Sequence, residues 1–474
     1  MLRRAEPSSR ASDRRWWQLV PLLLPLALPY AAPAAPPPLT PTRYDEDYSY
    51  LRNPDERTGA WWERLKFLPL DEEGHAWVTL GDEGRLRYES YWNRNFGPAP
   101  LRQDGYGRFR EMPYGALHVG DGLQLFVQLI AAYGLRSQLT ASPSDITNLD
   151  VLQALAEGRI PLGDDVGTLV LRGGRQVMVY GSGRLINPGP NIRLSFDGGL
   201  VRWERRGWRV DAFYVRPVVP TEGLFDDRSG PSFQLWSVYA TRTIRELPHC
   251  GFDLYYVGFR RDDTSYEQGE GRELRNTFGP RLFCSRDFWH FDIEGNVQAG
   301  RFADGGLLAW SAGGQGRFTA TGHPLLPWVG WRLGFFSGDG DAADGTLGTY
   351  NSIFPEGGYY GETGVVGPAN LVDAHVALGA ALGAGFSVEV DGLLFWRLRL
   401  GDGVYGMSGN LLRASGGSAE RFIGAQAETK LDWEQSRNLH FHLAVAALAP
   451  GIFIEATGPS STVYFLATHV VWAF

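Results

Sequence analysis

Arginine and acidic residues recur at every second position in several stretches of the chain. Arg85 and Arg87 form one such pair, and Glu389 and Asp391 form another. Side chains two positions apart in an extended strand point to the same face. Guanidinium groups bind carboxylates through paired hydrogen bonds, and a lining of them attracts anions. The pattern therefore predicts weak, repeated sites for an anionic solute and implies no covalent chemistry.

The residues that we expect to share this solute-facing surface are charged or carry an imidazole. The predicted cationic and imidazole members are Arg85, Arg87, Arg172, Arg175, Arg193, Arg397, Arg399, His440 and His442. The predicted acidic members are Asp211, Glu389 and Asp391. For any single arginine, an ion pair with a neighbouring acid is the alternative interpretation. The functional prediction therefore concerns the cluster as a whole.

Other kinds of chemistry find less support in the sequence, which contains no Gly-x-Ser-x-Gly motif and no P-loop motif. His440 and His442 could bind a metal from one strand face, but no third ligand is evident, so we expect them to line the charged surface. Asp339, Asp341 and Asp344 resemble a calcium loop without the full EF-hand spacing, and a solvated loop is the preferred interpretation. We therefore expect no cofactor and no enzymatic activity.

The elements that must position these residues are β-strands. Val78, Leu80 and Leu86 fall on one face of an alternating stretch that places Arg85 and Arg87 on the other. Residues 388–399 and 438–445 alternate in the same way. The chain is also rich in glycine, with 61 of 474 residues, and in aromatic residues, which make up 13%. Pattern and composition together predict an all-β protein.

Composition excludes two other classes of protein. Beyond the N-terminal segment the chain has no run of about 18 apolar residues, which excludes a helical membrane protein. Its 45 basic and 53 acidic residues give a net charge of −8, which argues against nucleic-acid binding. The alternation alone fits either a soluble sandwich or a membrane barrel, because strands of both kinds have one apolar face.

The two ends of the chain favour the membrane barrel. Residues 1–35 combine a basic start, a short apolar stretch and small residues, as a secretory signal peptide does. The last strand ends on Phe474, and a terminal aromatic residue is typical of proteins inserted by the barrel assembly machinery of the bacterial outer membrane. We therefore predict a signal peptide over 1–35, a periplasmic or lumen-side segment over 36–73 and an outer-membrane barrel over 74–474.

Short turns alternate along the chain with long polar loops such as 262–271 and 338–366. Short periplasmic turns and long extracellular loops are characteristic of outer-membrane barrels. Pairing strands across these connections predicts a transmembrane antiparallel β-barrel of about 18 strands. A barrel of that size is too wide for side chains to fill, so its charged face would line a water-filled lumen and its apolar face would meet lipid.

The two cysteines of the chain, Cys250 and Cys284, fall near the periplasmic ends of consecutive predicted strands. An oxidising periplasm would allow a disulfide between them. Two separate buried thiols are the alternative.

Several stretches, in order along most of residues 44–474, resemble the alginate export family of outer-membrane β-barrels. The matching segments are Leu171–Gln176, Tyr180–Leu185, Pro190–Gly198, Trp208–Phe213, Tyr359–Glu362, Gly367–Leu371, Phe395–Arg397 and Asp402–Gly406. The resemblance implies an 18-stranded barrel that passes an anionic polysaccharide outward through an arginine-rich constriction.

Arg172, Arg175 and Arg397 stand at motif positions that resemble those of the family's arginines, and Arg193 matches less closely. Strand parity puts Arg175 on the lipid side unless the glycines before it form a bulge. Near the end of the chain, His440 and His442 stand where the alginate exporter has alternating arginines. Imidazoles carry less fixed positive charge near neutral pH than guanidinium groups do.

We predict an outer-membrane channel that passes an anionic polysaccharide such as alginate. The alternatives are a general porin for small solutes, or an enzyme or adhesin built on the same barrel. The expected partners are outer-membrane lipid, the polysaccharide, the barrel assembly machinery and a periplasmic polymer-synthesis complex. No nucleic acid is expected among them.

Overall fold

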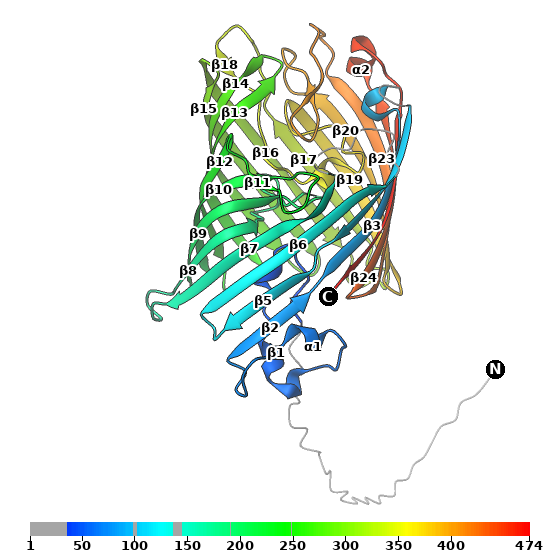
Figure 1. The fold of residues 1–474 in the computed structure, drawn as a ribbon. Helices are drawn as coiled ribbons and strands as arrows, with labels where there is room; N and C mark the ends of the chain where they lie inside the picture. The colour runs from blue at the N-terminus through cyan, green and yellow to red at the C-terminus, as the bar shows by residue number, and fades with distance from the viewer. Residues whose placement is uncertain (1–35, 98–101, 136–144, 190, 248) are drawn as a thin grey trace, which may run out of the picture.

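The computed structural model describes residues 36–97, 102–135, 145–189, 191–247 and 249–474. The predicted signal peptide, residues 1–35, lies outside the described residues. The rest of the chain forms a closed antiparallel barrel of 18 strands, as predicted, because the last strand pairs with the first (Figure 1). None of the helices in the described ranges is both long enough and apolar enough to span a membrane.

The barrel wall follows the order of the sequence. Its strands are β2 (Ala76–Gly81), β3 (Glu83–Trp92), β4 (Gln103–Glu111), β5 (Tyr114–Val119), β6 (Leu123–Leu135), β7 (Thr147–Pro161), β8 (Thr168–Val177), β9 (Ser195–Arg205), β10 (Trp208–Val219), β12 (Phe233–Thr243), β13 (Cys250–Tyr266), β14 (Gly269–Ser285), β15 (Trp289–Phe302), β16 (Gly305–Thr319), β17 (Trp328–Phe336), β19 (Leu371–Gly383), β20 (Phe386–Arg397), β23 (Phe422–Ser436), β24 (Leu439–Pro450) and β25 (Val463–Ala473). The pairs β2/β3 and β4/β5 each act as one interrupted wall strand, because β2 pairs with β5 and β3 with β4.

Small elements decorate the connections between wall strands. They are the strands β1 (Leu68–Pro69), β11 (Arg228–Ser229), β18 (Thr346–Leu347), β21 (Val404–Tyr405) and β22 (Leu411–Arg413), the helices α1 (Glu63–Lys66) and α2 (Ile452–Thr457), and the 3₁₀ turns η1 (Arg43–Asp45), η2 (Ser49–Arg52), η3 (Pro54–Glu56), η4 (Arg94–Phe96) and η5 (Gly357–Tyr360).

The wall strands have an apolar outer face, and polar side chains lie on the inner face of several of them. Leu254 and Phe278 point outward from β13 and β14 and are 52% and 56% exposed. Asp253 and Arg275, on the opposite faces of the same strands, are buried inside the barrel. Water solvates neither face fully, because the outer face would meet lipid and the inner face is covered by neighbouring polar groups and by loops. The alternation predicted from the sequence is therefore that of a barrel wall.

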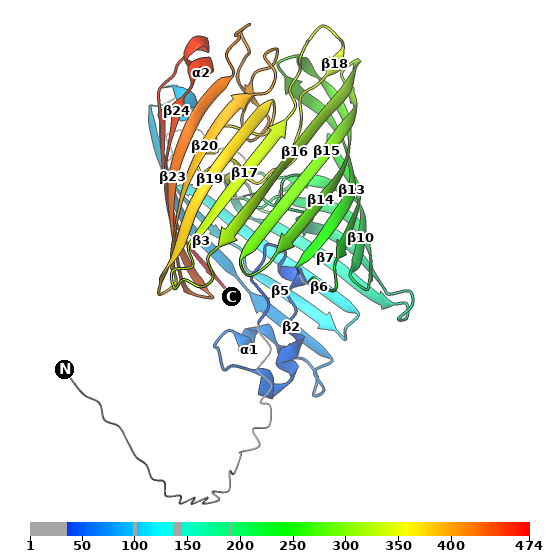
Figure 2. The same cartoon turned by 180° about the vertical axis from the view of Figure 1, so that it is seen from behind.

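The two ends of the barrel differ. Residues 36–75 and the C-terminus lie at one end, which we call the turn end; the opposite end is the loop end (Figures 1 and 2). The β16–β17 connection lies at the turn end, whereas the β17–β19 and β20–β23 connections both lie at the loop end and are long. The predicted long loop over 262–271 is wrong, because β13 runs to Tyr266 and β14 starts at Gly269. Buried and exposed side chains alternate up to the tip of this hairpin. The polar residues that suggested a loop therefore belong to the two strands.

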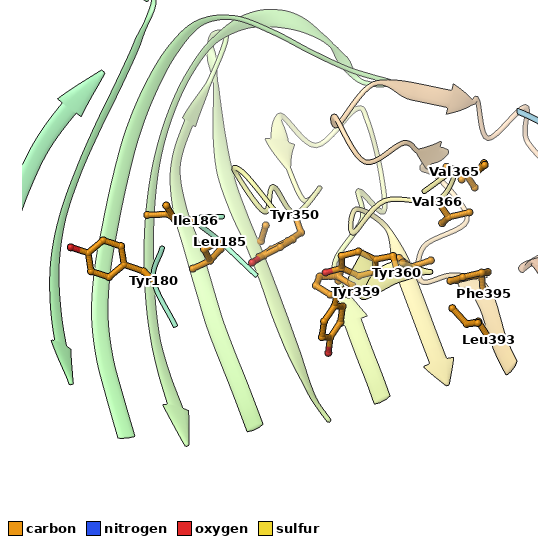
Figure 3. Close-up of a cluster of buried hydrophobic side chains, with 14 of the residues drawn as sticks. Tyr180, Leu185, Ile186, Tyr350, Tyr359, Tyr360, Val365, Val366, Leu393 and Phe395 are labelled. Atoms are coloured by element: carbon orange, nitrogen blue, oxygen red, sulfur yellow. The ribbon is translucent and has the colours of Figure 1, made fainter. Parts of the chain in front are cut away.

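Two connections at the loop end fold back inside the barrel. The first inserted loop comprises residues 178–189 and 191–194, and the second comprises residues 337–370. Ile186 and Phe354 form a backbone bridge between them, and Arg184 Nη2 donates a 2.8 Å hydrogen bond to the Tyr359 hydroxyl. Figure 3 shows Leu185, Tyr359 and other members of this apolar cluster inside the curve of the wall. The two loops therefore narrow the lumen in its loop-end half.

The segment before the first wall strand packs at the turn end. Tyr48, Leu51, Trp62 and Phe67 form a small core with Trp77 of β2. The β1 strand pairs with β2 beside Phe474, whose backbone exchanges hydrogen bonds with Asp82. This segment thus covers the wall where the C-terminal strand ends.

Cys250 and Cys284 face each other in register across β13 and β14 and form a disulfide. The predicted bond is therefore present in the structure, near the turn end of the barrel.

Candidate functional site

The turn-end half of the lumen contains a pocket of about 340 Å³ with an excess of positive charge. We call it the arginine pocket. Its charged lining residues are Arg43, Arg85, Arg110, Arg193, Arg437 and Glu83. Strands β3 and β4 position Arg85, Arg110 and Glu83, whereas the first inserted loop brings Arg193 across the lumen. Segments far apart in the sequence therefore build one cationic surface.

A single carboxylate serves three of these guanidinium groups. Glu83 lies 2.5 Å from Arg110, 3.2 Å from Arg193 and 3.4 Å from Arg43. Arg85 instead donates from Nη2 to Asn191 Oδ1 at 2.7 Å, and its Nε has no hydrogen-bond partner among the described residues. Buried guanidinium groups normally satisfy all their donors. The pocket therefore has unused capacity to bind a carboxylate.

A second arginine group lies around β8, β9 and β10 and is balanced by acids. Arg172 pairs with Glu157 and lies 3.1 Å from Asp45. Asp211 lies 2.9 Å from Arg202 and 2.7 Å from Arg209. Arg172 and Asp211 are thus both buried, and their charges are already paired.

Residues 36–46, which we call the N-terminal strap, cross the turn-end mouth between these two groups. At one end, Arg437 Nη2 donates to the Pro37 carbonyl at 2.5 Å. At the other, the Tyr44 hydroxyl donates to the Val177 carbonyl at 2.6 Å, and its ring packs against Phe126. The strap contributes Arg43 to the arginine pocket. The sequence predicted a periplasmic or lumen-side segment here. It gave no sign that the segment crosses the turn-end opening of the barrel.

The histidines form a ladder across neighbouring strands. Asp432, His442, His469 and Arg87 are consecutive cross-strand partners on β23, β24, β25 and β3. Asp432 Oδ1 lies 2.8 Å from His442 Nδ1 and 3.0 Å from His440 Nε2, and the His442 and His469 rings stack at 4.6 Å. Arg87 also pairs with Glu89. The ladder joins the basic part of the wall to an acidic part on β19, β20 and β23.

Sequence reasoning missed His469, Arg110 and Glu83 as members of the site. His469 lies on the lumen face of the last strand, and Arg110 alternates with Arg108 in the same pattern as Arg85 and Arg87. Strand parity could therefore have found both. The contribution of Arg43 depends on the path of the strap, which carries no such periodic signal.

Glu389 and Asp391 lie on the acidic part of the lumen wall. Glu389 Oε1 accepts a 2.8 Å hydrogen bond from Lys430, and Asp391 Oδ2 lies 3.8 Å from His375 Nδ1. His375 also lies 3.1 Å from Asp373. These acids lie on the same face of β20, and Asp391 is buried.

Three predicted lumen residues lie elsewhere. The strand pairing of β8 continues without a bulge past its glycines, so Arg175 lies on the face opposite Arg172 and pairs with Asp197 at 2.8 Å. Arg397 is 1% exposed and donates to the carbonyls of Leu400, Asp402, Ser418 and Glu420. Arg399 is exposed beyond the end of β20. The motif therefore points to an arginine with a structural role, because the Arg397 guanidinium links carbonyl groups of the loop-end backbone.

Asp339, Asp341 and Asp344, which resemble a calcium loop in sequence, do not come together as a metal site. Asp339 accepts backbone amide hydrogen bonds from Asp341 and Gly348, both at 2.9 Å. Within the described parts of the chain, three metal-ligating atoms come within 4.8 Å of one another only in the group of Asp150, Asp226 and Asp227. Arg175 Nη1 lies 3.6 Å from Asp150 and offsets part of that negative charge.

Comparison with known proteins identifies relatives of this barrel. A family model described as alginate export matches residues 76–468. A sequence search of curated proteins gives no match. Among solved structures, Pseudomonas aeruginosa OccK2 (OpdF) in complex with glucuronate has a TM-score of 0.54 at 12% identity, covering 84% of this chain and 98% of that chain.

Two further solved structures are similar to the same extent. Pseudomonas aeruginosa OccK9 (OpdG) has a TM-score of 0.55 at 12% identity, covering 84% of this chain and 98% of its own. Acinetobacter baumannii OccAB3 has a TM-score of 0.53 at 12% identity, covering 83% and 99%. At this identity the structural likeness concerns the fold.

Proposed function

This chain belongs to the alginate export family, and from that premise we propose that its lumen passes an anionic polysaccharide such as alginate. The protein is a channel of the bacterial outer membrane. The arginine pocket supports the step from a channel to an anionic polymer, because its lining holds five arginines and one acidic residue, Glu83, while Glu46 outside that lining pairs with Arg43 at 3.0 Å.

The physical argument concerns how strongly a passing carboxylate would be held. Guanidinium groups bind carboxylates in a fixed, bidentate geometry, and they do so most strongly where neighbouring groups have displaced water. A channel needs sites that bind well enough to draw the solute in and weakly enough to release it. Arg85 meets this requirement, because Asn191 orients one of its nitrogen atoms without neutralising its charge.

A barrel of the same fold adds support from its ligand. OccK2 was solved in complex with glucuronate, which is a sugar with a carboxylate. A uronate polymer presents such a group on each sugar unit. We infer that Arg85 receives these carboxylates in turn as the polymer moves along the lumen, with Arg110 and Arg193 adding to the positive charge around it.

The orientation and partners follow from the same proposal. Residues 1–35 would direct secretion, and the barrel assembly machinery would insert residues 74–474 with Phe474 at the end of the last strand. The turn end would face the periplasm, where residues 36–73 meet a polymer-synthesis complex. The apolar outer face would contact outer-membrane lipid.

A general porin for small solutes is the second candidate function. The observation that favours it is the neutralisation of Arg172 and Arg209 by Glu157 and Asp211, which leaves only part of the lumen cationic. A general porin would pass small anions without a specific response to a polymer.

Planar bilayers separate the two candidates. We expect an anion-selective conductance that a uronate oligosaccharide blocks, and we expect Arg85→Gln to weaken both selectivity and block. Arg399→Gln is the matched control, because it removes the same charge from an exposed site beyond the wall. Equal effects of the two variants would contradict a role for the arginine pocket. A selective conductance that the oligosaccharide leaves unchanged would favour the general porin.

A further inference from the structure

A second lumen pocket, of about 280 Å³, lies on the wall formed by β15, β16, β17, β19 and β20. We call it the tryptophan pocket. Its lining includes His290, Gln315, Trp328, His375, Glu389 and Asp391. Its volume is near the lower end of the range for small-molecule sites, and its lining combines one aromatic platform with several polar groups. These are features of a binding site rather than of a gap in packing.

The indole of Trp328 lies against the wall. Gly379 is its partner in the neighbouring strand, and a Cβ atom on Gly379 would come within 2.3 Å of the indole ring. A Cβ atom on Gly330 would also crowd the ring, at 3.1 Å. Glycine at both positions therefore lets the ring rest on the strand backbone. The Arg317 guanidinium lies 5.5 Å from the ring centroid and helps to hold it there.

Polar groups beside this platform have unused hydrogen-bonding capacity. Asp391 is 3% exposed, and its Oδ1 has no hydrogen-bond partner among the described residues. Buried carboxylate oxygens are normally paired, so an unpaired one that lines a pocket points to a ligand that donates hydrogen bonds. Gln315 and His290 can both donate and accept hydrogen bonds.

The charge balance of this pocket differs from that of the arginine pocket. Glu389 and Asp391 line it together with Arg317 and Arg332, so it lacks an excess of positive charge. A carboxylate ligand would meet carboxylates here. A pyranose ring fits the lining better, because its hydroxyl groups can donate to Asp391 and accept from Gln315 while its C–H face lies on the indole.

We infer that the tryptophan pocket is a saccharide subsite that binds the ring and hydroxyl groups of a sugar unit. This inference rests on the proposed function only in taking the ligand to be a unit of the passing polysaccharide. The two pockets then divide the recognition of a uronate chain, since the arginine pocket binds its carboxylates and the tryptophan pocket binds its neutral face. Recognition of hydroxyl groups would also extend to neutral sugars.

The test uses the full chain in planar bilayers with two probes, hexamannuronate and the neutral hexasaccharide mannohexaose. We expect mannohexaose to block the current reversibly, and Trp328→Ala to raise its half-blocking concentration by about tenfold. Asp391→Asn should weaken the same block, whereas Arg85→Gln should weaken only the block by hexamannuronate. Trp310→Ala is the matched control, because Trp310 lies on the neighbouring strand β16, is 40% exposed and is not among the residues that line the pocket.

Folding of each variant is checked by the shift in gel mobility between unheated and heated protein, and Trp328→Phe retains a platform if the alanine variant does not fold. Absence of block by mannohexaose, or equal block of Trp328→Ala and Trp310→Ala, would overturn the subsite. Block by hexamannuronate that still depends on Arg85 would leave the proposed function standing in that case.

Discussion

Asp45 of the N-terminal strap forms a 3.1 Å ion pair with Arg172 of the wall. A carboxylate of the chain itself is therefore bound to an arginine in the predicted solute path. The Asp45 side chain is 41% exposed, whereas Arg172 is 2% exposed. An ion pair with one exposed partner contributes about 0–1 kcal/mol, so Asp45 is a replaceable ligand. Tyr44 is the stronger anchor, because its ring and hydroxyl are both buried against the wall.

We predict that Tyr44→Ala detaches the strap from the wall and raises the single-channel conductance. Truncating a buried aromatic residue costs about 3 kcal/mol or more, which exceeds the contribution of the Asp45 ion pair. Asp45→Asn should raise the conductance less. Asp47→Asn is its control, since Asp47 caps only the local amide of Ser49. If Tyr44→Ala leaves the conductance at the wild-type value, the strap does not obstruct the lumen.

Lys66 gives the docking of the N-terminal segment a pH dependence. Burial lowers the pKa of Lys66 to about 7, and the carboxylate of Glu46 offsets only part of this effect. Its Nζ lies 4.7 to 5.6 Å from the ring centroids of Tyr48, Tyr114 and Phe474 and 2.5 Å from the Tyr114 hydroxyl. The docked segment therefore binds fewer protons than the undocked one between pH 7 and the ordinary lysine pKa of 10.5.

Docking should consequently strengthen as the pH rises through that interval. Below pH 7 the docked segment bears the full free-energy cost of burying a charged Lys66. The total change in the free energy of docking is about 5 kcal/mol at most, because each pKa unit corresponds to about 1.4 kcal/mol. Hydrogen exchange of residues 48–67, corrected for intrinsic rates, should show greater protection at pH 9 than at pH 6. Lys66→Met should abolish the difference. Equal protection of the wild-type segment at both values would contradict the prediction.

The strand pattern could be predicted because it depends on local alternation. Leu254 and Asp253 occupy opposite faces of β13 whatever their distant neighbours are. The same parity puts Arg85 and Asp391 on the inner face of the wall, where both are buried. It also gave the correct position for Arg175, on the opposite face from Arg172, although the family resemblance suggested the lumen.

The rest of the site depends on where irregular segments travel, which alternation does not determine. Arg193 reaches the arginine pocket because the first inserted loop crosses the lumen, and Arg43 reaches it because the strap does. Arg397 was predicted from a motif in the wall, but the loop carbonyls that enclose it come from residues 400–420. Such contacts join irregular segments whose course depends on tertiary packing, so the strand pattern of the sequence does not predict them.

The disulfide between Cys250 and Cys284 should stabilise the barrel against unfolding. The bond closes a loop with a sequence separation of 34, for which chain entropy predicts about 3–4 kcal/mol. The double variant Cys250→Ser, Cys284→Ser should therefore lose its folded gel mobility at a lower temperature than the wild type. Reductant should shift the wild type in the same direction and leave the variant unchanged. Equal midpoints for oxidised wild type and variant would show that strand pairing alone determines the stability.

Arg397 and Arg399 should behave differently although they are two positions apart. Arg397 donates hydrogen bonds to four loop carbonyls and stacks on Phe453 at 3.8 Å, whereas Arg399 is exposed. Lysine carries the same charge but cannot donate in these several directions at once. Arg397→Lys should therefore lower stability by about 3 kcal/mol or more, since hydrogen bonds to charged groups contribute about 1.5–3 kcal/mol each.

The matched variant Arg399→Lys should leave stability unchanged, and neither variant should alter the anion selectivity of protein that remains folded. The midpoint of the heat-induced gel shift and the reversal potential measure these two properties separately. A loss of selectivity in folded Arg397→Lys protein would return Arg397 to the lumen, as the motif alone suggested. A loss of stability without a change in selectivity would show that this arginine acts on the loop-end backbone through the geometry of its hydrogen bonds.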